Sequence, residues 1–394
     1  MPAMKISVLL PTRNRLDYLR LAVESVRRQQ DEDWEIVVSD NCSEDDVAGY
    51  VASLGDPRIV FSRFDHPVPV TDNWNRALSL ARGQYLVMLG DDDALRPGYM
   101  ARMRTLLREF EEPDLVYTGA DLFTYPGVDP DHPDGYLMPF GHAAILQRGR
   151  VPYVLEASEA LGLVRSTMEF VVSFGFNMQF ALFSRNLVDR LAPHGPFFQS
   201  EFPDYYAMNA SFLSARRIVV EPSPQVVIGV TPKSYGFFYV NQREEEGSQF
   251  LRADRVPIPP GSHINRGWLD AVEHLQEHFG DRFGFEVDRR RYRRLQCQAV
   301  YEQFRLGRID RKGVAAFAGE LPPAERILFR LACLVTVDPD RARRLLRPLR
   351  PLRPLLPEPR RQFTAWRPPK VTGPWRTIIE AMDATGAPDV DATP

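Results

Sequence analysis

The stretch from Gln84 to Leu95 constrains the fold of this chain more than any other. It reads Gln-Tyr-Leu-Val-Met-Leu-Gly-Asp-Asp-Asp-Ala-Leu, an apolar run followed at once by glycine and three aspartates. A short apolar run with a charged boundary is typical of a strand buried on both faces of a parallel sheet. Asp91, Asp92 and Asp93 then follow the carboxyl end of this strand, which is where open α/β sheets bind ligands.

Three adjacent carboxylates permit two interpretations. They repel one another unless a positive charge lies among them, and Mg²⁺ or Mn²⁺ carrying a diphosphate supplies such a charge. Aspartate is also a favoured N-cap, and residues 98–110 have a helical pattern, so the aspartates can simply start that helix. The stretch alone leaves both interpretations open.

Composition excludes several classes of protein. A net charge of -3 over 394 residues argues against wholesale nucleic-acid binding. The three cysteines are far apart and lack metal-ligand spacing, which favours a reduced cytoplasmic setting without disulfides. The amino terminus lacks a signal-peptide pattern, and no apolar run reaches the roughly 18 residues of a membrane span. We therefore expect a cytoplasmic protein whose contact with the inner face of the membrane, if it has one, is peripheral.

Strands and helices alternate along the first part of the chain. Residues 6–10, 35–40 and 58–61 have strand patterns separated by amphipathic helical segments, which predicts a doubly wound, mainly parallel, Rossmann-like α/β sheet in residues 1–250. Residues 122–150 are rich in Pro, Gly, Asp and His and predict a long loop or an excursion over the sheet edge. Residues 251–340 contain only helical patterns, which predicts a helical appendage. Residues 341–394 form a basic, Pro-rich tail that we expect to be partly disordered.

Four segments, taken in order, resemble family 2 glycosyltransferases with the GT-A fold. They are Ile6–Arg15 (Ile-Ser-Val-Leu-Leu-Pro-Thr-Arg-Asn-Arg), Val37–Asn41 (Val-Val-Ser-Asp-Asn), Ala81–Asp93, which ends in Leu-Gly-Asp-Asp-Asp, and Glu201–Tyr206 (Glu-Phe-Pro-Asp-Tyr-Tyr). The resemblance covers about residues 4–240. It implies a GT-A-like fold and a metal-dependent, inverting transfer of sugar from a nucleoside diphosphate sugar to a hydroxyl acceptor, in glycan or polysaccharide assembly.

The resemblance also implies which residues bind the donor and the metal. The nucleotide sugar would contact the first two strand ends and the aspartate run, at Pro11, Thr12, Arg13, Arg15, Asp40, Asn41, Asp91 and Asp92. Mg²⁺ or Mn²⁺ would bind Asp91 and Asp93, although Gly90 stands where many members have the first aspartate, so the register stays open. Helix capping is the alternative role for Thr12 and Asn14.

A third set of residues is expected near the acceptor. By the same resemblance Asp204 is the catalytic base, with Glu201 as a substitute and capping of the following helix as the structural alternative. Lys233, on a late loop, can meet the diphosphate or simply be solvated.

Other functions fit the sequence less well. A sugar-phosphate nucleotidyltransferase would use the same sheet, but it usually has a Gly-rich first loop, and here that loop is Pro-Thr-Arg-Asn-Arg. A non-catalytic, GT-A-like binding protein is the other alternative. The pattern His274-Leu-Gln-Glu-His278 matches some zinc peptidases, but a solvated helix face explains it better. Arg341–Arg361, with eight Arg against one Glu, can contact anionic lipid, a lipid-linked acceptor or a partner.

Overall fold

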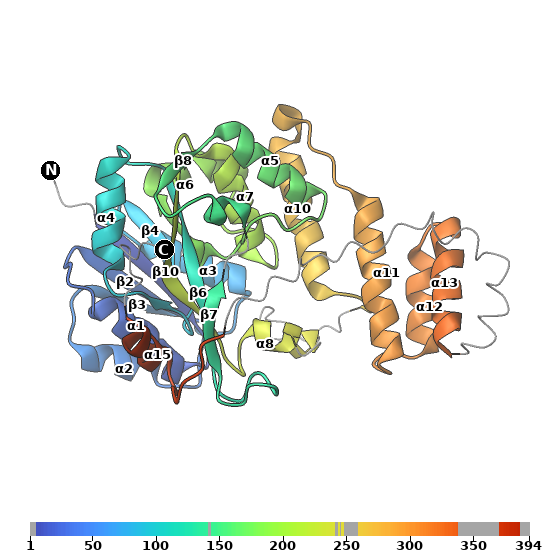
Figure 1. The fold of residues 1–394 in the computed structure, drawn as a ribbon, viewed down its shortest axis with the longest axis horizontal. Coiled ribbons are helices and arrows are strands. Elements are labelled where there is room, and N and C mark those ends of the chain that lie inside the picture. Colours follow the sequence, from blue (N-terminus) through green and yellow to red (C-terminus); the bar gives the residue numbers. More distant parts are fainter. Residues whose placement is uncertain are drawn as a thin grey trace.

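The computed structural model describes residues 5–140, 143–240, 243–244, 246–247, 259–337 and 370–386. Its centre is a ten-stranded sheet in which the order β3-β2-β1-β4-β9-β6-β10-β5 is hydrogen-bonded, while β7 pairs with β6 and β8 with β10 (Figure 1). The strands are β1 (Ile6–Thr12), β2 (Trp34–Asp40), β3 (Ile59–Arg63), β4 (Tyr85–Met88), β5 (Ala94–Leu95), β6 (Leu115–Thr124), β7 (Tyr136–Phe140), β8 (Tyr153–Leu155), β9 (Ala181–Ser184) and β10 (Ile218–Val230).

Most of the sheet runs in one direction. Strands β3, β2, β1 and β4 are mutually parallel, β9 lies antiparallel between β4 and β6, and β6 is parallel to β10. The carboxyl ends of these parallel strands therefore meet at one edge. The predicted α/β class with a mainly parallel sheet is confirmed.

Helices cover the sheet and extend beyond it. Those of the α/β part are α1 (Leu16–Arg27), α2 (Val47–Leu54), α3 (Val70–Leu80), α4 (Tyr99–Glu109), α5 (Ala157–Met168), α6 (Arg185–Leu191), α7 (Pro203–Ser214) and α8 (Tyr235–Val240), with short 3₁₀ turns η1 (Ala144–Gln147), η2 (Met178–Phe180) and η3 (Ala192–His194). The extension consists of α10 (His263–Phe283), α11 (Arg289–Arg305), α12 (Arg311–Glu320) and α13 (Pro323–Val337).

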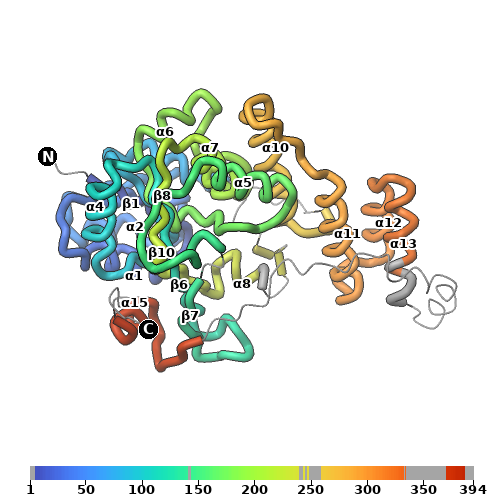
Figure 2. Tube along the Cα trace, turned by 45° about the horizontal axis from the view of Figure 1, so that its top comes forward, coloured from blue at the N-terminus to red at the C-terminus, as the bar shows by residue number. Residues whose placement is uncertain are grey.

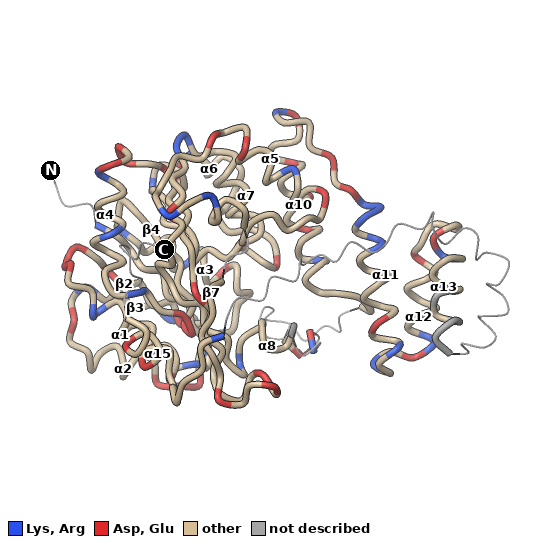
Figure 3. Tube along the Cα trace, in the orientation of Figure 1, with Lys and Arg blue, Asp and Glu red and all other residues tan. Residues whose placement is uncertain are grey.

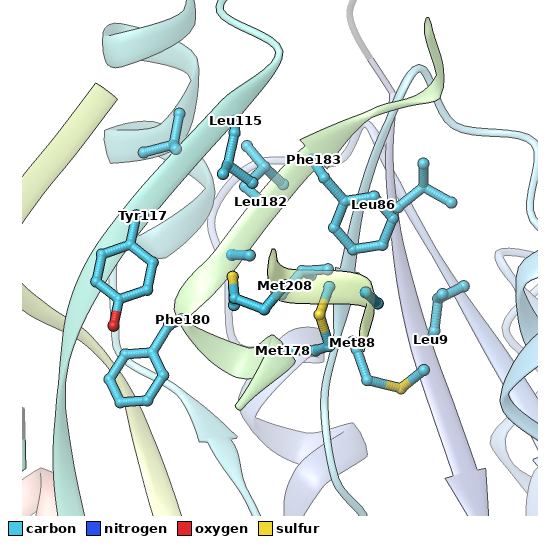
Figure 4. Close-up of a cluster of buried hydrophobic side chains, with 14 of the residues drawn as sticks. Leu9, Leu86, Met88, Leu115, Tyr117, Met178, Phe180, Leu182, Phe183 and Met208 are labelled. Carbon is cyan, nitrogen blue, oxygen red and sulfur yellow. The ribbon is translucent and has the colours of Figure 1, made fainter. Parts of the chain in front are cut away.

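The centre of the sheet is buried because its strands are apolar on both faces. Every residue of β1, β2 and β4 is buried. Figure 4 shows side chains of β1, β4, β6, β9 and α7 packed together, among them Leu9, Leu86, Leu115, Phe183 and Met208. This packing holds the strand ends of the site in fixed positions.

The helical extension divides into two parts. The side chains of Trp268, Val272 and Phe279 on α10 belong to the main core, whereas α11, α12 and α13 pack around a separate cluster that includes Val300 and Phe329. α11 begins Arg-Arg-Arg-Tyr-Arg-Arg, and its basic residues stand out at the far side of the molecule from β3 (Figure 3). The predicted helical C-terminal region is confirmed.

Residues 370–386, the C-terminal segment, return to the α/β sheet. They include α15 (Ile378–Thr385), which lies beside α1 in both Figure 1 and Figure 2. The sequence did not predict this helix. The basic stretch Arg341–Arg361 lies outside the described residues. No helix within the described ranges is long and apolar enough to cross a membrane.

The prediction of a long loop in residues 122–150 was wrong. β6 continues to Thr124, and β7 pairs antiparallel with it from Tyr136 to Phe140. Pro and Gly in this stretch mark the turn between these two strands.

Replacing Leu86 by alanine should destabilise the protein strongly. Leu86 is fully buried on the central strand β4, and the cavity left by Leu→Ala lowers the free energy of unfolding by about 2–5 kcal/mol. Val154→Ala is the control, because this β8 side chain is 43% exposed and should cost about 0.5 kcal/mol or less. Urea denaturation measures both. Equal losses in the two variants would contradict the described burial of β4.

Candidate functional site

The three aspartates do not start a helix. They follow β4 directly, but α4 begins at Tyr99, and Gly98 is its N-cap. The capping interpretation of Asp91, Asp92 and Asp93 is therefore wrong. All three side chains are buried at the carboxyl edge of the sheet, so their position needs another explanation.

Asp91 and Asp92 converge on one guanidinium. Arg15 Nη1 lies 3.0 Å from Asp91 Oδ1 and 3.4 Å from Asp92 Oδ2. The Thr12 hydroxyl donates to Asp91 Oδ2 at 2.7 Å, and the Ser234 hydroxyl donates to Asp92. Two carboxylates from the end of β4 thus share a single cation from the loop after β1.

Burial and charge shift the pKa values of this cluster. Burial raises the pKa of Asp91, and the nearby Asp92 adds to this, while Arg15 acts in the opposite direction. Burial disfavours the charged form of Arg15, but Asp91 and Asp92 outweigh it and raise the pKa of the guanidinium. The cluster therefore holds a concentrated negative charge that a cation must balance.

Asp93 faces away from this cation. Its Oδ2 accepts from Gly90 N at 2.9 Å and from Gln179 Nε2 at 2.6 Å, and its Oδ1 accepts from Gly229 N at 2.9 Å. Burial, with the charge of Asp92, raises the pKa of Asp93 to about 8. Asp93 thus joins the end of β4 to β10 and to η2, with its acceptor positions already used by the protein.

Two glycines make this arrangement possible. A Cβ on Gly90 would lie 2.5 Å from Asp93 Oδ2, and one on Gly229 would lie 1.9 Å from the Asp92 carbonyl oxygen. Both contacts are too short for any side chain. Position 90 therefore requires glycine, because the Asp93 side chain folds back over it.

The loop after β1 does not cap α1 through Thr12 or Asn14. The Leu16 amide at the start of α1 donates to Asp45 Oδ2 at 3.0 Å, whereas Asn14, with φ of 56°, accepts from Glu44 N at 2.7 Å. The capping alternative for these two residues is wrong. Pro11 lies in β1, paired with Ser39 of β2. Arg13 is half-buried in the same loop.

Asp40 and Asn41 are engaged within the protein. Asp40 is 0% exposed, with Oδ2 2.7 Å from Arg63 Nη1 and Oδ1 accepting from Ser43 N at 3.0 Å. The Asn41 side-chain amide makes two hydrogen bonds of 2.8 Å with the backbone of Val68. These residues shape the end of β2 and the loop after β3.

Asp204 is the second residue of α7 and does not cap it. Phe202 occupies the N-cap position, and Pro203 fits the first turn because no amide hydrogen is needed there. The Asp204 carboxylate accepts from the Tyr205 amide at 3.1 Å. Burial raises its pKa to about 7. A carboxyl with this pKa can accept a proton near neutral pH.

Glu201 is held by a histidine of the extension. Its Oε2 lies 2.8 Å from His263 Nε2, and His263 is buried at the start of α10. Within the described residues, Glu201 is therefore paired with a side chain, whereas Asp204 is contacted by the Tyr205 backbone amide.

The loop from Thr231 to Tyr235 connects the aspartates to α7. Ser234 contacts Asp92, the Lys233 carbonyl accepts from Arg15 Nη2, and the rings of Tyr235 and Phe202 lie 5.2 Å apart. Lys233 Nζ itself donates to Asn14 O at 3.0 Å. Sequence reasoning placed Lys233 on this loop but missed Ser234, since a single serine has no distinguishing pattern.

The structure thus brings most of the predicted residues to one edge of the sheet. Arg15, Thr12, Asp91, Asp92 and the Lys233 loop are in direct contact. Gln179 and Arg63 were missed, because each reaches the site from a distant segment whose sequence gives no signal.

Within the described residues, no group of three or more His, Cys, Asp or Glu side chains has the arrangement of a metal centre. The rings of His274 and His278 stack on each other at 6.2 Å, and each meets the Tyr206 ring edge-on, at 6.0 and 5.6 Å. Both side chains are half-buried, so the expected solvated face is partly covered by Tyr206. For a divalent cation, Asp91 and Asp92 offer the fitting donors, because both face the position now taken by Arg15.

Comparisons with known proteins concern mainly the first part of the chain. Residues 7–156 match the family described as glycosyl transferase family 2. The putative colanic acid biosynthesis glycosyl transferase WcaA of Escherichia coli (strain K12) is 35% identical over 98 residues, which are 24% of this chain and 35% of that protein. The GalNAc(5)-diNAcBac-PP-undecaprenol beta-1,3-glucosyltransferase of Campylobacter jejuni is 36% identical over 111 residues, 27% of this chain and 35% of its own length.

The reach of these similarities is limited. The chain spans about a third of the length of the two relatives, and Asp204 lies beyond the matched residues 7–156. The crystal structure of S. aureus TarS 1–349 in complex with UDP-GlcNAc gives a TM-score of 0.48 at 16% identity, covering 89% of this chain and 88% of that one. At this TM-score the structural similarity adds nothing to the functional argument.

Replacing Asp204 by asparagine should change how stability depends on pH. The folded-state pKa of about 7 lies above the ordinary value of 3.8, so the folded protein binds a proton that the unfolded chain releases between these pH values. This contribution to stability is complete below pH 4 and is lost as the pH rises through 7. Asp204→Asn should therefore lose less stability than the wild type between pH 5 and 8.

Urea denaturation at these two pH values measures the difference. Asp72→Asn is the matched control, since Asp72 is an exposed carboxylate in the first turn of α3. If wild type, Asp204→Asn and Asp72→Asn all lose the same stability, the raised pKa of Asp204 is wrong.

Proposed function

We propose that the protein transfers a sugar from a nucleoside diphosphate sugar to a hydroxyl acceptor, with inversion at the anomeric carbon. The match of residues 7–156 to glycosyl transferase family 2 supports this proposal. The observation that carries this proposal is the buried Asp91–Arg15–Asp92 cluster at the carboxyl edge of the sheet. Asp204 at the start of α7, with its pKa of about 7, supports it.

The proposed reaction is a direct displacement. Asp204 takes the proton of the acceptor hydroxyl, and the oxygen of that hydroxyl forms a bond to the anomeric carbon. The bond between that carbon and the diphosphate oxygen breaks, and the nucleoside diphosphate leaves with the electron pair. A general base must lie close to the hydroxyl and have a pKa near the working pH. Burial raises the pKa of Asp204 to about 7, which meets the second requirement. Glu201 is the less suitable base because His263 engages it.

A divalent cation, Mn²⁺ or Mg²⁺, is the proposed cofactor and would stabilise charge on the departing diphosphate. Asp91 and Asp92 would hold it, which revises the prediction of Asp91 and Asp93. Asp93 fits poorly because its oxygens accept from Gly90, Gly229 and Gln179. Arg15 and Arg13 would meet phosphate oxygens, a role suited to guanidinium groups. Lys233 stays a further candidate for the diphosphate.

The nucleoside is proposed to bind beside the ends of β1 and β2. Pro11 and Thr12 would contact the nucleoside directly. Asp40 would act indirectly, by holding the end of β2 in place, because Arg63 and the Ser43 amide already bind its two carboxylate oxygens. Asn41 would act in the same indirect way, by fixing the backbone at Val68.

The setting is proposed to be glycan or polysaccharide assembly. The names of the Escherichia coli and Campylobacter jejuni relatives, which refer to colanic acid and to an undecaprenol-linked glycan, support this setting and a lipid-linked acceptor. Arg341–Arg361 would provide peripheral contact with an anionic membrane. A nucleotidyltransferase is disfavoured because the loop after β1 has no glycine.

Metal and nucleotide should stabilise the protein together. We expect one of UDP, GDP, dTDP or CDP with Mn²⁺ to raise the free energy of unfolding by about 2.7 kcal/mol at a hundredfold excess over its dissociation constant. Asp92→Asn removes a proposed metal ligand and should abolish the effect, while Asp72→Asn should retain it. Thermal unfolding measures this. Stabilisation that is equal in Asp92→Asn and wild type would contradict the metal assignment.

Asp204→Asn should separate binding from transfer. Loss of a general base lowers the rate by about 10²–10⁴-fold, whereas nucleotide stabilisation should be unchanged. The rate is measured as nucleoside diphosphate released from the matching nucleotide sugar with simple glycosides as acceptors. Glu201→Gln is the paired variant and should keep most of the activity. If Glu201→Gln is inactive and Asp204→Asn is active, the base has been assigned to the wrong carboxylate.

A further inference from the structure

A pocket of about 620 Å³ lies where the C-terminal segment meets the sheet edge. Its walls come from the first part of α1, the turn between β6 and β7, the loop after β10 and the C-terminal segment. The side chains used below are Asp17, Tyr18, Tyr125, Asp134, Trp375 and Arg376. Its volume is within the range of about 300–1,000 Å³ that is usual for small-molecule sites.

The wall supplied by the C-terminal segment is anchored at both ends. Val371 exchanges two backbone hydrogen bonds with Leu137 of β7, at 2.9 and 2.8 Å. On α15, the side chains of Ile378, Ile379, Ala381 and Met382 are buried in one cluster with Phe123 and Tyr125. At the far end Arg96 Nη1 donates to Gly386 O at 3.0 Å. The wall is therefore part of the folded core.

Trp375 is held in place within this wall. A Cβ on Gly373 would lie 2.5 Å from the Trp375 ring, so only glycine lets the ring fold back to this position. Trp375 also packs against the buried cluster around Tyr125. One indole ring is thus presented to the pocket in a fixed orientation.

The pocket shares a wall with the aspartate cluster. Pro232 lines it, and two residues further along the same loop Ser234 donates to Asp92. Tyr18, on the opposite wall, has a raised pKa because of burial and then because of the nearby charge of Asp92. A ligand in the pocket would therefore lie next to the proposed donor site without occupying it.

The chemistry of the walls selects a class of ligand. Tyr18, Tyr125 and Trp375 offer aromatic surface with polar edges, which suits the C–H faces of sugar rings and the hydroxyls around them. Asp17, Asp134 and Arg376 supply two negative charges and one positive charge at the rim. The net negative charge of these three side chains repels phosphate and nucleotide. Their polar atoms can form hydrogen bonds with the hydroxyls of a neutral sugar.

We propose that this pocket binds a sugar unit of the acceptor glycan, remote from the hydroxyl that reacts. The proposal rests on the proposed transferase function, because it names the acceptor's second point of contact. Trp375 and Tyr18 stack on the sugar ring, and Asp17, Asp134 and Arg376 bond to its hydroxyls. The C-terminal segment is thereby a specificity element of the transferase.

Saturation-transfer NMR on the full chain tests the proposal. The probes are methyl glycosides of the common hexoses, 6-deoxyhexoses and N-acetylhexosamines. At least one should bind to the wild type, and Trp375→Ala should weaken it at least tenfold. Trp375→Phe keeps a ring and should retain most of the affinity. Asp383→Asn is the control on the same segment, outside the pocket and in a surface ion pair with Arg28, and it should bind like the wild type.

The outcomes separate this proposal from the transferase proposal. No binding of any probe, or equal binding to wild type and Trp375→Ala, overturns the sugar pocket. Nucleotide stabilisation with Mn²⁺ is measured on the same variants and should be unchanged by Trp375→Ala. If sugars bind through Trp375 but no nucleotide stabilises the protein, the pocket is a sugar site but not an acceptor site, and the transferase function fails.

Discussion

The contact of Arg15 with Asp91 and Asp92 is the interaction on which the rest of the site depends. Two buried carboxylates in succession are strongly unfavourable unless a cation lies between them, and Arg15 provides that cation from the loop after β1. The same guanidinium donates to the Lys233 carbonyl, so the ends of β1, β4 and β10 meet around one charge. In the proposed function, a divalent cation would take the place between these carboxylates that Arg15 now fills.

Asp93 has the opposite character, although it is the next residue. It is enclosed by two backbone amides and one amide side chain, and its raised pKa indicates a carboxyl that need not be charged. The two neighbouring aspartates therefore have different roles. Asp92 faces Arg15, and Asp93 holds the strand ends together. Gly90 and Gly229 are required for this division, since a side chain at either position would collide with the aspartates.

Local patterns in the sequence predicted those features that depend on local structure. The apolar runs at 6–10 and 35–40 became β1 and β2, and the position of the aspartates at a strand end followed from β4. Features made by distant partners were not predictable in this way. Nothing near Asp93 indicates that Gln179 and Gly229 will bind it, and nothing near Asp40 points to Arg63. The antiparallel β9 between β4 and β6 and the return of α15 are likewise long-range pairings, which leave no periodic signal in their own residues.

The ion pair between Arg28 and Asp383 joins residues 355 positions apart. Contacts of such long sequence separation form late, because a long loop must close before they contribute. On a ribosome, α1 and the first strands emerge long before residues 370–386 can reach them. The sheet and the aspartate cluster can therefore assemble first, while the pocket beside them still lacks one wall. Residues 370–386 then add that wall to an edge that has already folded.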